Sequence, residues 1–193
     1  MPSCKLGPGF PLWLQKQRNF SYIDVSNTGL SGNISNCFQN LSCRASHINL
    51  SKNLLSGHIP SSIGYTIPNL WILDLSDNRL TGKIPSTICK VQELIFLCLS
   101  NNHFLGELPQ CRDVNFHYFW KPDLSSNKLF GQIPSWISSL YILTSLHLSI
   151  NNFSGEFPSA LKNSYRLETL DLGENKFSGT IPPWIGIEGT IHS

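Results

Sequence analysis

Apolar residues recur along the chain in a pattern that repeats every 24 or 25 residues. One unit reads LDLSDNRLTGKIP over residues 73–85, and the next reads LCLSNNHFLGELP over residues 97–109. Each unit places leucine-type residues at alternate positions, then a polar turn, a glycine and an apolar residue before proline. The glycines mark the period: Gly32, Gly57, Gly82, Gly106, Gly131, Gly155 and Gly179. A fixed period of this length is typical of a solenoid, in which every unit forms one coil.

The alternating apolar residues of each unit predict a short strand, because residues two apart on a strand point to the same face. Their side chains should enter a shared core, where each buried aliphatic group contributes about 1.5–3 kcal/mol. Stacked coils bring the strands together, so we expect a parallel sheet on the concave face, with short irregular or 3₁₀ segments outside. The sequence therefore predicts an α/β-class solenoid, a right-handed superhelix of about seven repeats.

A polar residue follows each predicted strand at the point where the chain turns. A side-chain amide there can bond backbone groups that the turn leaves unpaired, each of which otherwise costs about 1–3 kcal/mol. We expect these residues, with Thr28 as a variant, to stack as a structural ladder: Asn53, Asn78, Asn102, Asn127, Asn151 and Asn175. The glycine allows a positive φ, and the apolar-proline pair packs inward.

The pattern covers residues 1–193 and predicts a single repeat domain. Residues 1–19 match the end of a unit and form a partial repeat, and full repeats occupy residues 20–190. A solenoid needs polar caps over its two exposed ends, and the pattern shows neither. We therefore expect the chain to be a fragment of a longer protein.

Composition excludes several classes of partner. The net charge is +2 and the basic residues are scattered, which gives no reason to expect nucleic acid as a partner. The six cysteines include no CxxC pair, so we expect no metal site, and GPGF at residues 7–10 is a turn rather than a phosphate loop, so we expect no cofactor. Cys37 and Cys43 are close enough for a small disulfide loop, and free buried thiols are the alternative.

The unit LxLSxNxLxGxIP resembles the plant-specific class of extracellular leucine-rich repeats, and the resemblance covers nearly the whole chain. Residues 4–34 are similar in particular to the ectodomains of plant leucine-rich-repeat receptor-like proteins of the fungal-elicitor receptor type. This resemblance implies a plasma-membrane protein that binds a protein, peptide or glycan ligand on the concave face and signals through a co-receptor kinase. The signal peptide, N-terminal cap and transmembrane helix of that family are not seen, so membrane attachment would lie in parts outside this chain.

The expected function is non-catalytic recognition in plant defence or development. No residue pattern supplies a nucleophile beside a positioned base and an oxyanion hole, so we do not expect an enzyme. A secreted inhibitor of a fungal polygalacturonase and a non-functional receptor gene remnant are the alternatives.

Several Asn-x-Ser sequences fit the N-glycosylation signal and are consistent with a secreted surface. We expect Asn19, Asn33 and Asn40 to carry glycans before Asn49, which lies on a predicted strand.

Outward residues of the predicted strands form rows across the concave face, because neighbouring strands lie about 4.8 Å apart. Trp71, Ile95 and Trp120 share one slot, and Ile72, Phe96 and Lys121 share the next. Exposed apolar patches of this kind usually bind ligands, and tryptophan is enriched among energetically important contacts. In the alternative, the strand around Pro122 is irregular and Trp120 packs into the core.

A third row is polar and contains His147 between Asp123 and Asp171. Acids on both sides should favour the charged imidazole, which makes this row a candidate for an acid-sensitive ligand contact. The alternative is a solvated polar row with no specific role. The predicted ligand surface thus comprises Trp71, Ile72, Ile95, Phe96, Trp120, Lys121, Asp123 and His147.

Overall fold

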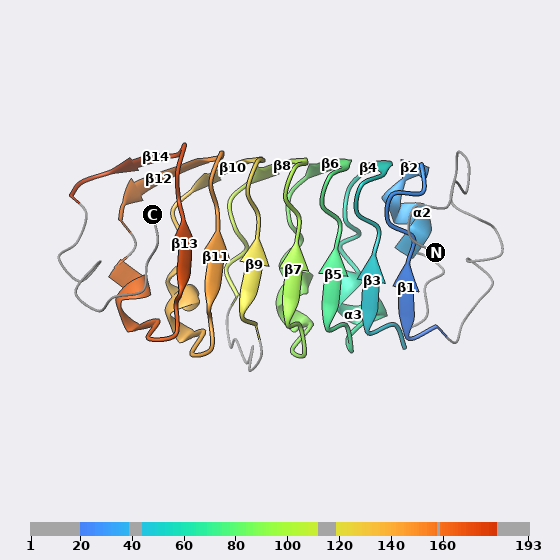
Figure 1. The fold of residues 1–193 in the computed structure, drawn as a ribbon, viewed down its shortest axis with the longest axis horizontal. Helices are drawn as coiled ribbons and strands as arrows, with labels where there is room; N and C mark the ends of the chain where they lie inside the picture. Colours follow the sequence, from blue (N-terminus) through green and yellow to red (C-terminus); the bar gives the residue numbers. More distant parts are fainter. Residues whose placement is uncertain (1–19, 39–43, 112–118, 158, 181–193) are drawn as a thin grey trace.

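The computed structural model describes residues 20–38, 44–111, 119–157 and 159–180, and it confirms a leucine-rich-repeat solenoid. Seven parallel strands form the first sheet in chain order, side by side from β1 to β13 (Figure 1). They are β1 (Tyr22–Asp24), β3 (His47–Asn49), β5 (Ile72–Asp74), β7 (Phe96–Cys98), β9 (Lys121–Asp123), β11 (Ser145–His147) and β13 (Thr169–Asp171). Each strand contributes its central apolar residue to the core.

A second parallel sheet runs along one edge of the solenoid, at the top of Figure 1. Its strands are β2 (Ser31–Asn33), β4 (Leu54–Gly57), β6 (Arg79–Gly82), β8 (His103–Gly106), β10 (Lys128–Gly131), β12 (Asn152–Glu156) and β14 (Lys176–Ser178). The sequence pattern did not predict this sheet. β2 buries no apolar side chain, and each of the other strands sends a single one inward, so no alternation is long enough to be recognised in the sequence.

Short helical turns complete the outside of the coils. They are α2 (Ile34–Phe38), α3 (Ile63–Thr66), η1 (Ser86–Lys90), η2 (Ser135–Ser139) and η3 (Ser159–Asn163), of which the last three are 3₁₀ turns. Pro85 and Pro134 stand directly before η1 and η2 in extended conformation. A proline here fixes φ where no helical hydrogen bond is needed, which starts each turn.

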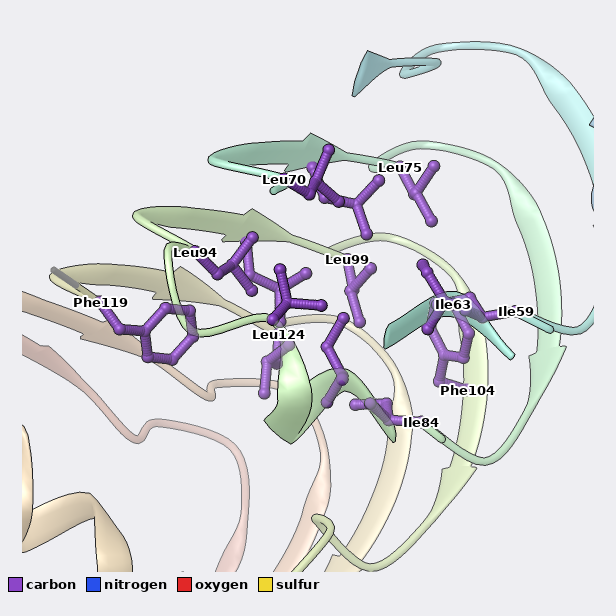
Figure 2. Packing of buried hydrophobic residues seen from close by; sticks show 14 of the residues in the cluster. Ile59, Ile63, Leu70, Leu75, Ile84, Leu94, Leu99, Phe104, Phe119 and Leu124 are labelled. Atoms are coloured by element: carbon purple, nitrogen blue, oxygen red, sulfur yellow. The ribbon is translucent and has the colours of Figure 1, made fainter. Parts of the chain in front are cut away.

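One continuous apolar core connects the two sheets and the helical turns. Figure 2 shows Leu75 and Leu99 from neighbouring coils packed in this core with Phe104 of the second sheet. Leu75 and Phe104 are almost completely shielded from solvent. Because each coil buries its apolar edge against the next, stability comes from contacts between neighbours, as expected for a repeat protein.

The asparagines after the first-sheet strands form hydrogen bonds within and between coils. Asn102 Nδ2 donates to the carbonyls of Leu75, Leu99 and Ser100 at 2.9–3.2 Å. Its Oδ1 accepts the Leu80 N–H at 2.9 Å. The same arrangement recurs in the neighbouring coils at Asn53, Asn78, Asn127, Asn151 and Asn175. One side chain therefore pairs backbone groups of two coils that would otherwise be buried without partners.

A residue with left-handed backbone conformation precedes each ladder position, with φ between 50° and 56°. These residues are Asn27, Lys52, Asp77, Asn101, Ser126, Ile150 and Glu174. Asparagine and aspartate tolerate this region, whereas a β-branched residue is strained in it. Ile150 is the β-branched member of this set, and its side chain is 47% exposed.

Strand β9 departs from the regular pattern because Pro122 occupies the slot that leucine fills in β5 and β7. β9 pairs with β11 only through Asp123 and His147, whereas β5 and β7 pair through three residues each. Proline has no N–H to donate to the next strand, which explains the shortened pairing. An apolar cavity of about 40 Å³ lies beside Pro122, between Leu97, Leu124 and Leu146.

A disulfide joins Cys89 of η1 to Cys111, 22 residues later, next to this cavity. The chain-entropy estimate for a loop of this length is about 3 kcal/mol of stabilisation. The sequence did not predict this pairing, and for these two residues the alternative of free thiols is wrong. The Cys37–Cys43 prediction lies outside the side chains that the structure describes.

Within the described ranges, no helix is long and apolar enough to cross a membrane.

Candidate functional site

The outer face of the first sheet carries three rows of side chains, aligned by the strand register. Ile72, Phe96 and Lys121 are paired neighbours, and Asp74, Cys98 and Asp123 are paired two residues further along the same strands. The residues before the strands are aligned too, since Ile95 N–H donates to Trp71 O and Trp120 N–H donates to Ile95 O. The structure therefore brings the two predicted apolar rows together on one surface.

Both tryptophans of these rows are accessible to a ligand. Trp71 is 43% exposed and Trp120 is 42% exposed, whereas the adjacent Phe119 is only 4% exposed. Trp120 does not pack into the core, because its side chain is exposed and Phe119 fills the inward position. The irregularity expected around Pro122 is seen in the shortened pairing of β9 with β11, whereas β9 keeps a three-residue register with β7. Ile72, Ile95 and Phe96 are half-buried between the two indoles. Exposed apolar groups in contact across neighbouring strands are the usual sign of a binding surface.

Two rings that the sequence reasoning missed extend this surface toward the N-terminus. The Tyr22 and His47 ring centroids are 5.6 Å apart, and those of His47 and Trp71 are 5.9 Å apart with the ring planes at 61°. Ser46 Oγ lies 2.9 Å from His47 Nδ1 and holds the imidazole in place. Tyr22 and His47 occupy the slot of Ile72 in the two preceding coils, so the slot comparison could have found them.

We use the name aromatic band for the described residues of this continuous surface: Tyr22, His47, Trp71, Ile72, Ile95, Phe96, Trp120 and Lys121. Its two tryptophans differ in the residue that follows them. Lys121 Nζ lies 5.4 Å from the centroid of the Trp120 ring, which is the geometry of a cation–π contact. Trp71 is followed by Ile72 instead, so the corresponding position beside Trp71 is apolar.

The polar row has a local structural role. Asp74 Oδ1 accepts the Ser76 N–H at 3.0 Å and the Ser76 hydroxyl at 2.7 Å. Asp123 Oδ1 makes the same two bonds to Ser125 at 3.0 and 2.7 Å. These carboxylates therefore hold the turn that leaves each strand, as aspartate does in Asx turns. Asp123 Oδ2 also accepts from the Cys98 thiol of the neighbouring strand at 3.8 Å.

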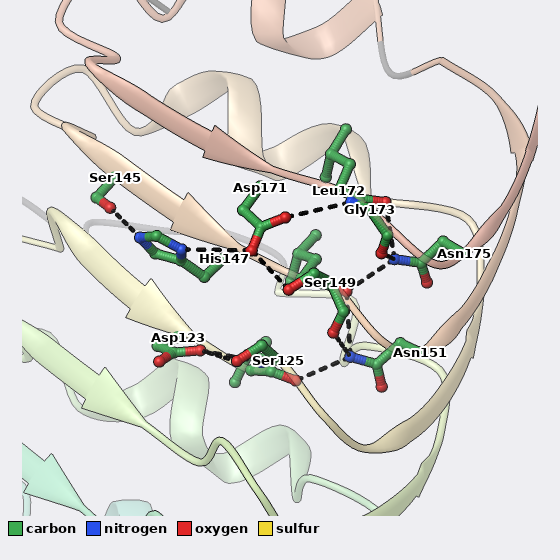
Figure 3. Close-up of polar contacts among 12 residues, drawn as sticks. Asp123, Ser125, Ser145, His147, Ser149, Asn151, Asp171, Leu172, Gly173 and Asn175 are labelled. Carbon is green, nitrogen blue, oxygen red and sulfur yellow. Dashed lines mark hydrogen bonds and ion pairs between the residues drawn. The ribbon is translucent and has the colours of Figure 1, made fainter. Parts of the chain in front are cut away.

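His147 lies on β11, between Asp123 of β9 and Asp171 of β13 in this row, and its contacts are drawn in Figure 3. Its Nδ1 is 3.9 Å from Asp171 Oδ2, and its Nε2 is 2.7 Å from Ser145 Oγ. Ser149 Oγ donates to the same Asp171 oxygen at 2.6 Å. The structure thus brings His147 close to one of its two flanking acids through direct contact.

Cys98 occupies the aspartate slot in β7 and is 7% exposed. Burial raises the pKa of its thiol to about 11, and a contact to Ser100 Oγ at 3.2 Å offsets this only in part. A thiol with this pKa stays protonated at neutral pH and is a poor nucleophile. Among the residues that the structure describes, no group of histidine, cysteine and carboxylate side chains is arranged to hold a metal ion.

Of the three favoured glycosylation sites, the structure describes Asn33. It ends β2 and is exposed, and its Oδ1 accepts the Ser35 N–H at 2.9 Å. Asn19 and Asn40 lie outside the described residues.

Comparison with known proteins gives matches at the level of sequence family and of fold. A family model described as Leucine Rich Repeat matches residues 45–65, 69–91, 123–140, 143–164 and 166–186. The tomato (Solanum lycopersicum) Receptor-like protein EIX2 is 44% identical over 41 residues, which are 21% of this chain. The matched segment is 4% of that relative, so the chain corresponds to a small part of it.

Two solved plant receptors have similar folds. The plant peptide hormone receptor RGFR1, in complex with RGF2, superposes with a TM-score of 0.86 and 31% identity over 94% of this chain. The Arabidopsis receptor kinase HAESA, in complex with the peptide hormone IDA and the co-receptor SERK1, superposes with a TM-score of 0.78 and 30% identity over 95% of this chain. The chain spans 29% and 34% of the length of these two structures.

Proposed function

The chain belongs to the leucine-rich-repeat family, and from that premise we propose that it is a non-catalytic recognition segment of a plant cell-surface receptor. In this proposal the aromatic band binds an extended peptide or a peptide segment of a protein. The single observation that carries it is the exposure of Trp71 and Trp120 on one face of a rigid parallel sheet. Exposed indoles with half-buried apolar neighbours can provide the central contacts of an interface.

The relatives named above support a receptor over the inhibitor alternative. EIX2 is a receptor-like protein, and RGFR1 and HAESA were solved with peptide hormones. By analogy with the complex of HAESA and SERK1, we propose that the parent protein acts with a co-receptor kinase. We also propose that the parent protein lies at the cell surface and that these repeats face the extracellular side.

The contacts of His147 with Ser145 and Asp171 resemble the order of a catalytic triad, but their geometry supports a structural role. The distance of 3.9 Å between His147 Nδ1 and Asp171 Oδ2 is too long for the hydrogen bond that positions a catalytic histidine. The Ser145 N–H donates to Trp120 O within the sheet, so it is not free to stabilise an oxyanion. We therefore propose that Ser145 and His147 take part in recognition or in packing, not in hydrolysis.

Selection from a phage-displayed random peptide library with the full chain tests the proposed binding surface. Peptides enriched on the chain should lose binding at least tenfold on Trp71→Ala or Phe96→Ala, since central aromatic contacts typically contribute about 2 kcal/mol or more. Tyr141→Ala is the matched control, because Tyr141 is 79% exposed but follows η2, away from the aromatic band. Equal losses on the control variant, or no loss on Trp71→Ala and Phe96→Ala, would refute the proposal.

We further propose that Asn33 carries an N-linked glycan when the parent protein is secreted. Its side chain is exposed at the end of β2, where Nδ2 can be modified while Oδ1 keeps its bond to Ser35. Enzymatic removal of glycans should lower the mass of a peptide containing Asn33, and Asn33→Gln should abolish that change. An unmodified Asn33 in protein secreted from plant cells would contradict this assignment.

A further inference from the structure

The two tryptophans of the aromatic band occupy the same slot in coils two repeats apart and differ in what covers them. Trp120 carries Lys121 Nζ at 5.4 Å from its ring centroid. Trp71 is exposed to the same extent, but the residue in the slot of Lys121 is Ile72. The His47 ring lies 5.9 Å from the Trp71 ring on the other side of this site. Trp120 shows that a tryptophan of this row accepts a cation from the position that Ile72 occupies beside Trp71.

The charges around Trp71 also favour a cation. Asp74 lies on the same outer face as Ile72 and three residues beyond Trp71, which is about 10 Å along the strand. Asp24 lies two strands away in the same row. The cation of the aromatic band, Lys121, lies on β9, two strands from β5 and therefore about 10 Å away. Its ammonium lies over the ring of Trp120, and none of the ion pairs of the described residues involves Asp74.

We infer that Trp71 and Asp74 form a binding site for a cationic side chain of the ligand, and specifically for an arginine in an extended peptide. A guanidinium stacks on an indole face and also donates hydrogen bonds to a carboxylate, which an ammonium does less well. The Asp74 Oδ1 atom is engaged with Ser76, so Oδ2 is the acceptor for this arginine. This inference rests on the proposed function and adds the charge of the ligand to it.

The test compares peptides that differ in one charge. A set of peptides carries arginine at one position, and a matched set carries citrulline, which has the same shape without the charge. The full chain should bind the arginine set about two- to fivefold more tightly, in line with measured cation–π contacts at partly exposed sites. Asp74→Asn should reduce this preference, and it keeps the turn because Asn49 already accepts the Ser51 N–H in the same way at 3.0 Å.

Two reciprocal variants make the test specific. Ile72→Lys supplies Trp71 with its own cation, as in the coil of Trp120, and should abolish the preference for arginine. Lys121→Ile removes the cation from Trp120 and should create a second arginine site. Peptides with two arginines should then bind this variant more tightly than they bind the original chain. Both changes copy a residue found in the same slot of another coil, so both variants should fold, as circular dichroism can verify.

The outcomes separate this inference from the proposed function. Equal binding of arginine and citrulline peptides, both lost on Phe96→Ala, would overturn the cation site and leave the binding surface in place. No binding of either set would overturn both. A preference for arginine that survives Ile72→Lys would place the cation elsewhere and would also overturn the inference.

Discussion

Strands β5 and β9 lie two coils apart and differ at two adjacent positions of otherwise equivalent segments. Residues 71–74 read Trp-Ile-Leu-Asp and residues 120–123 read Trp-Lys-Pro-Asp. The inward difference, Leu73 against Pro122, coincides with a cavity and a shortened strand pairing at β9. The outward difference, Ile72 against Lys121, determines whether the neighbouring indole is covered by a cation. In a repeat protein, stability and surface chemistry can therefore vary independently at neighbouring residues.

The largest effect is expected when β5 is given the inward residue of β9. Leu73→Pro removes a ladder donor and leaves a void in a fully buried site, so the free energy of unfolding should fall by about 4 kcal/mol or more. Denaturant unfolding of the full chain measures the change. Leu73→Met is the control and should cost less than about 1.5 kcal/mol because it conserves volume. If Leu73→Pro lowered the free energy of unfolding as little as Leu73→Met does, β5 would tolerate a proline as β9 does, and the prediction would be wrong.

The asparagine ladder should be insensitive to the difference between the two strands. Asn78 follows β5 and Asn127 follows β9, and each leaves several buried backbone groups unpaired when it is removed. Asn78→Ala and Asn127→Ala should each cost about 3 kcal/mol. Lys128→Ala, an exposed neighbour, should change stability by less than about 0.5 kcal/mol. Clearly unequal losses in thermal unfolding of the two ladder variants would show that Pro122 also weakens the turn behind it.

The reverse exchange should improve β9. Pro122→Leu restores a backbone donor and fills part of the cavity of about 40 Å³, so it should raise the free energy of unfolding by about 1–2 kcal/mol. Pro122→Ala restores the donor without the volume and should give a smaller gain. Thermal unfolding of both variants divides the effect between hydrogen bonding and packing. Destabilisation by Pro122→Leu would show that the cavity cannot accept the larger side chain.

A smaller gain is expected at a turn outside both strands. Ile150 adopts a φ of 55°, a region in which a β-branched side chain is strained. Ile150→Asn should raise the free energy of unfolding by about 1 kcal/mol, since asparagine occurs at this slot in other coils. Comparing this gain with that of Pro122→Leu shows whether the strained backbone at Ile150 or the missing donor and cavity at Pro122 costs more stability. An unchanged melting temperature would show that the local backbone relaxes around isoleucine.

The sequence predicted the first sheet, the ladder positions and the alignment of the outward rows because these depend on one period. It did not predict the second sheet, whose strands bury at most one apolar side chain each and so show no alternation. It also missed the Cys89–Cys111 pair, because both residues follow the proline of their units, where the repeat sets no spacing between cysteines. Tyr22 and His47 were not predicted as part of the binding surface, although the strand register places them in the slot of Ile72.

The polar row shows a further limit of sequence reasoning. The alignment of His147 with its acidic neighbours follows from the period. The period does not predict that Asp74 and Asp123 hydrogen-bond to their turns, because this depends on which carboxylate oxygen faces the backbone. Side-chain orientation is fixed by local contacts, which the pattern of residue types leaves open.

Photo-cross-linking tests most directly the claim that the aromatic band is the recognition surface. A photoreactive amino acid is placed in the full chain either at Ile95, in the centre of the band, or at Leu105, which is 43% exposed on the second sheet. The pooled arginine and citrulline peptides then serve as the ligand for both proteins. We predict cross-linked peptide from the Ile95 position and little or none from Leu105. Efficient cross-linking from Leu105 without cross-linking from Ile95 would contradict the account.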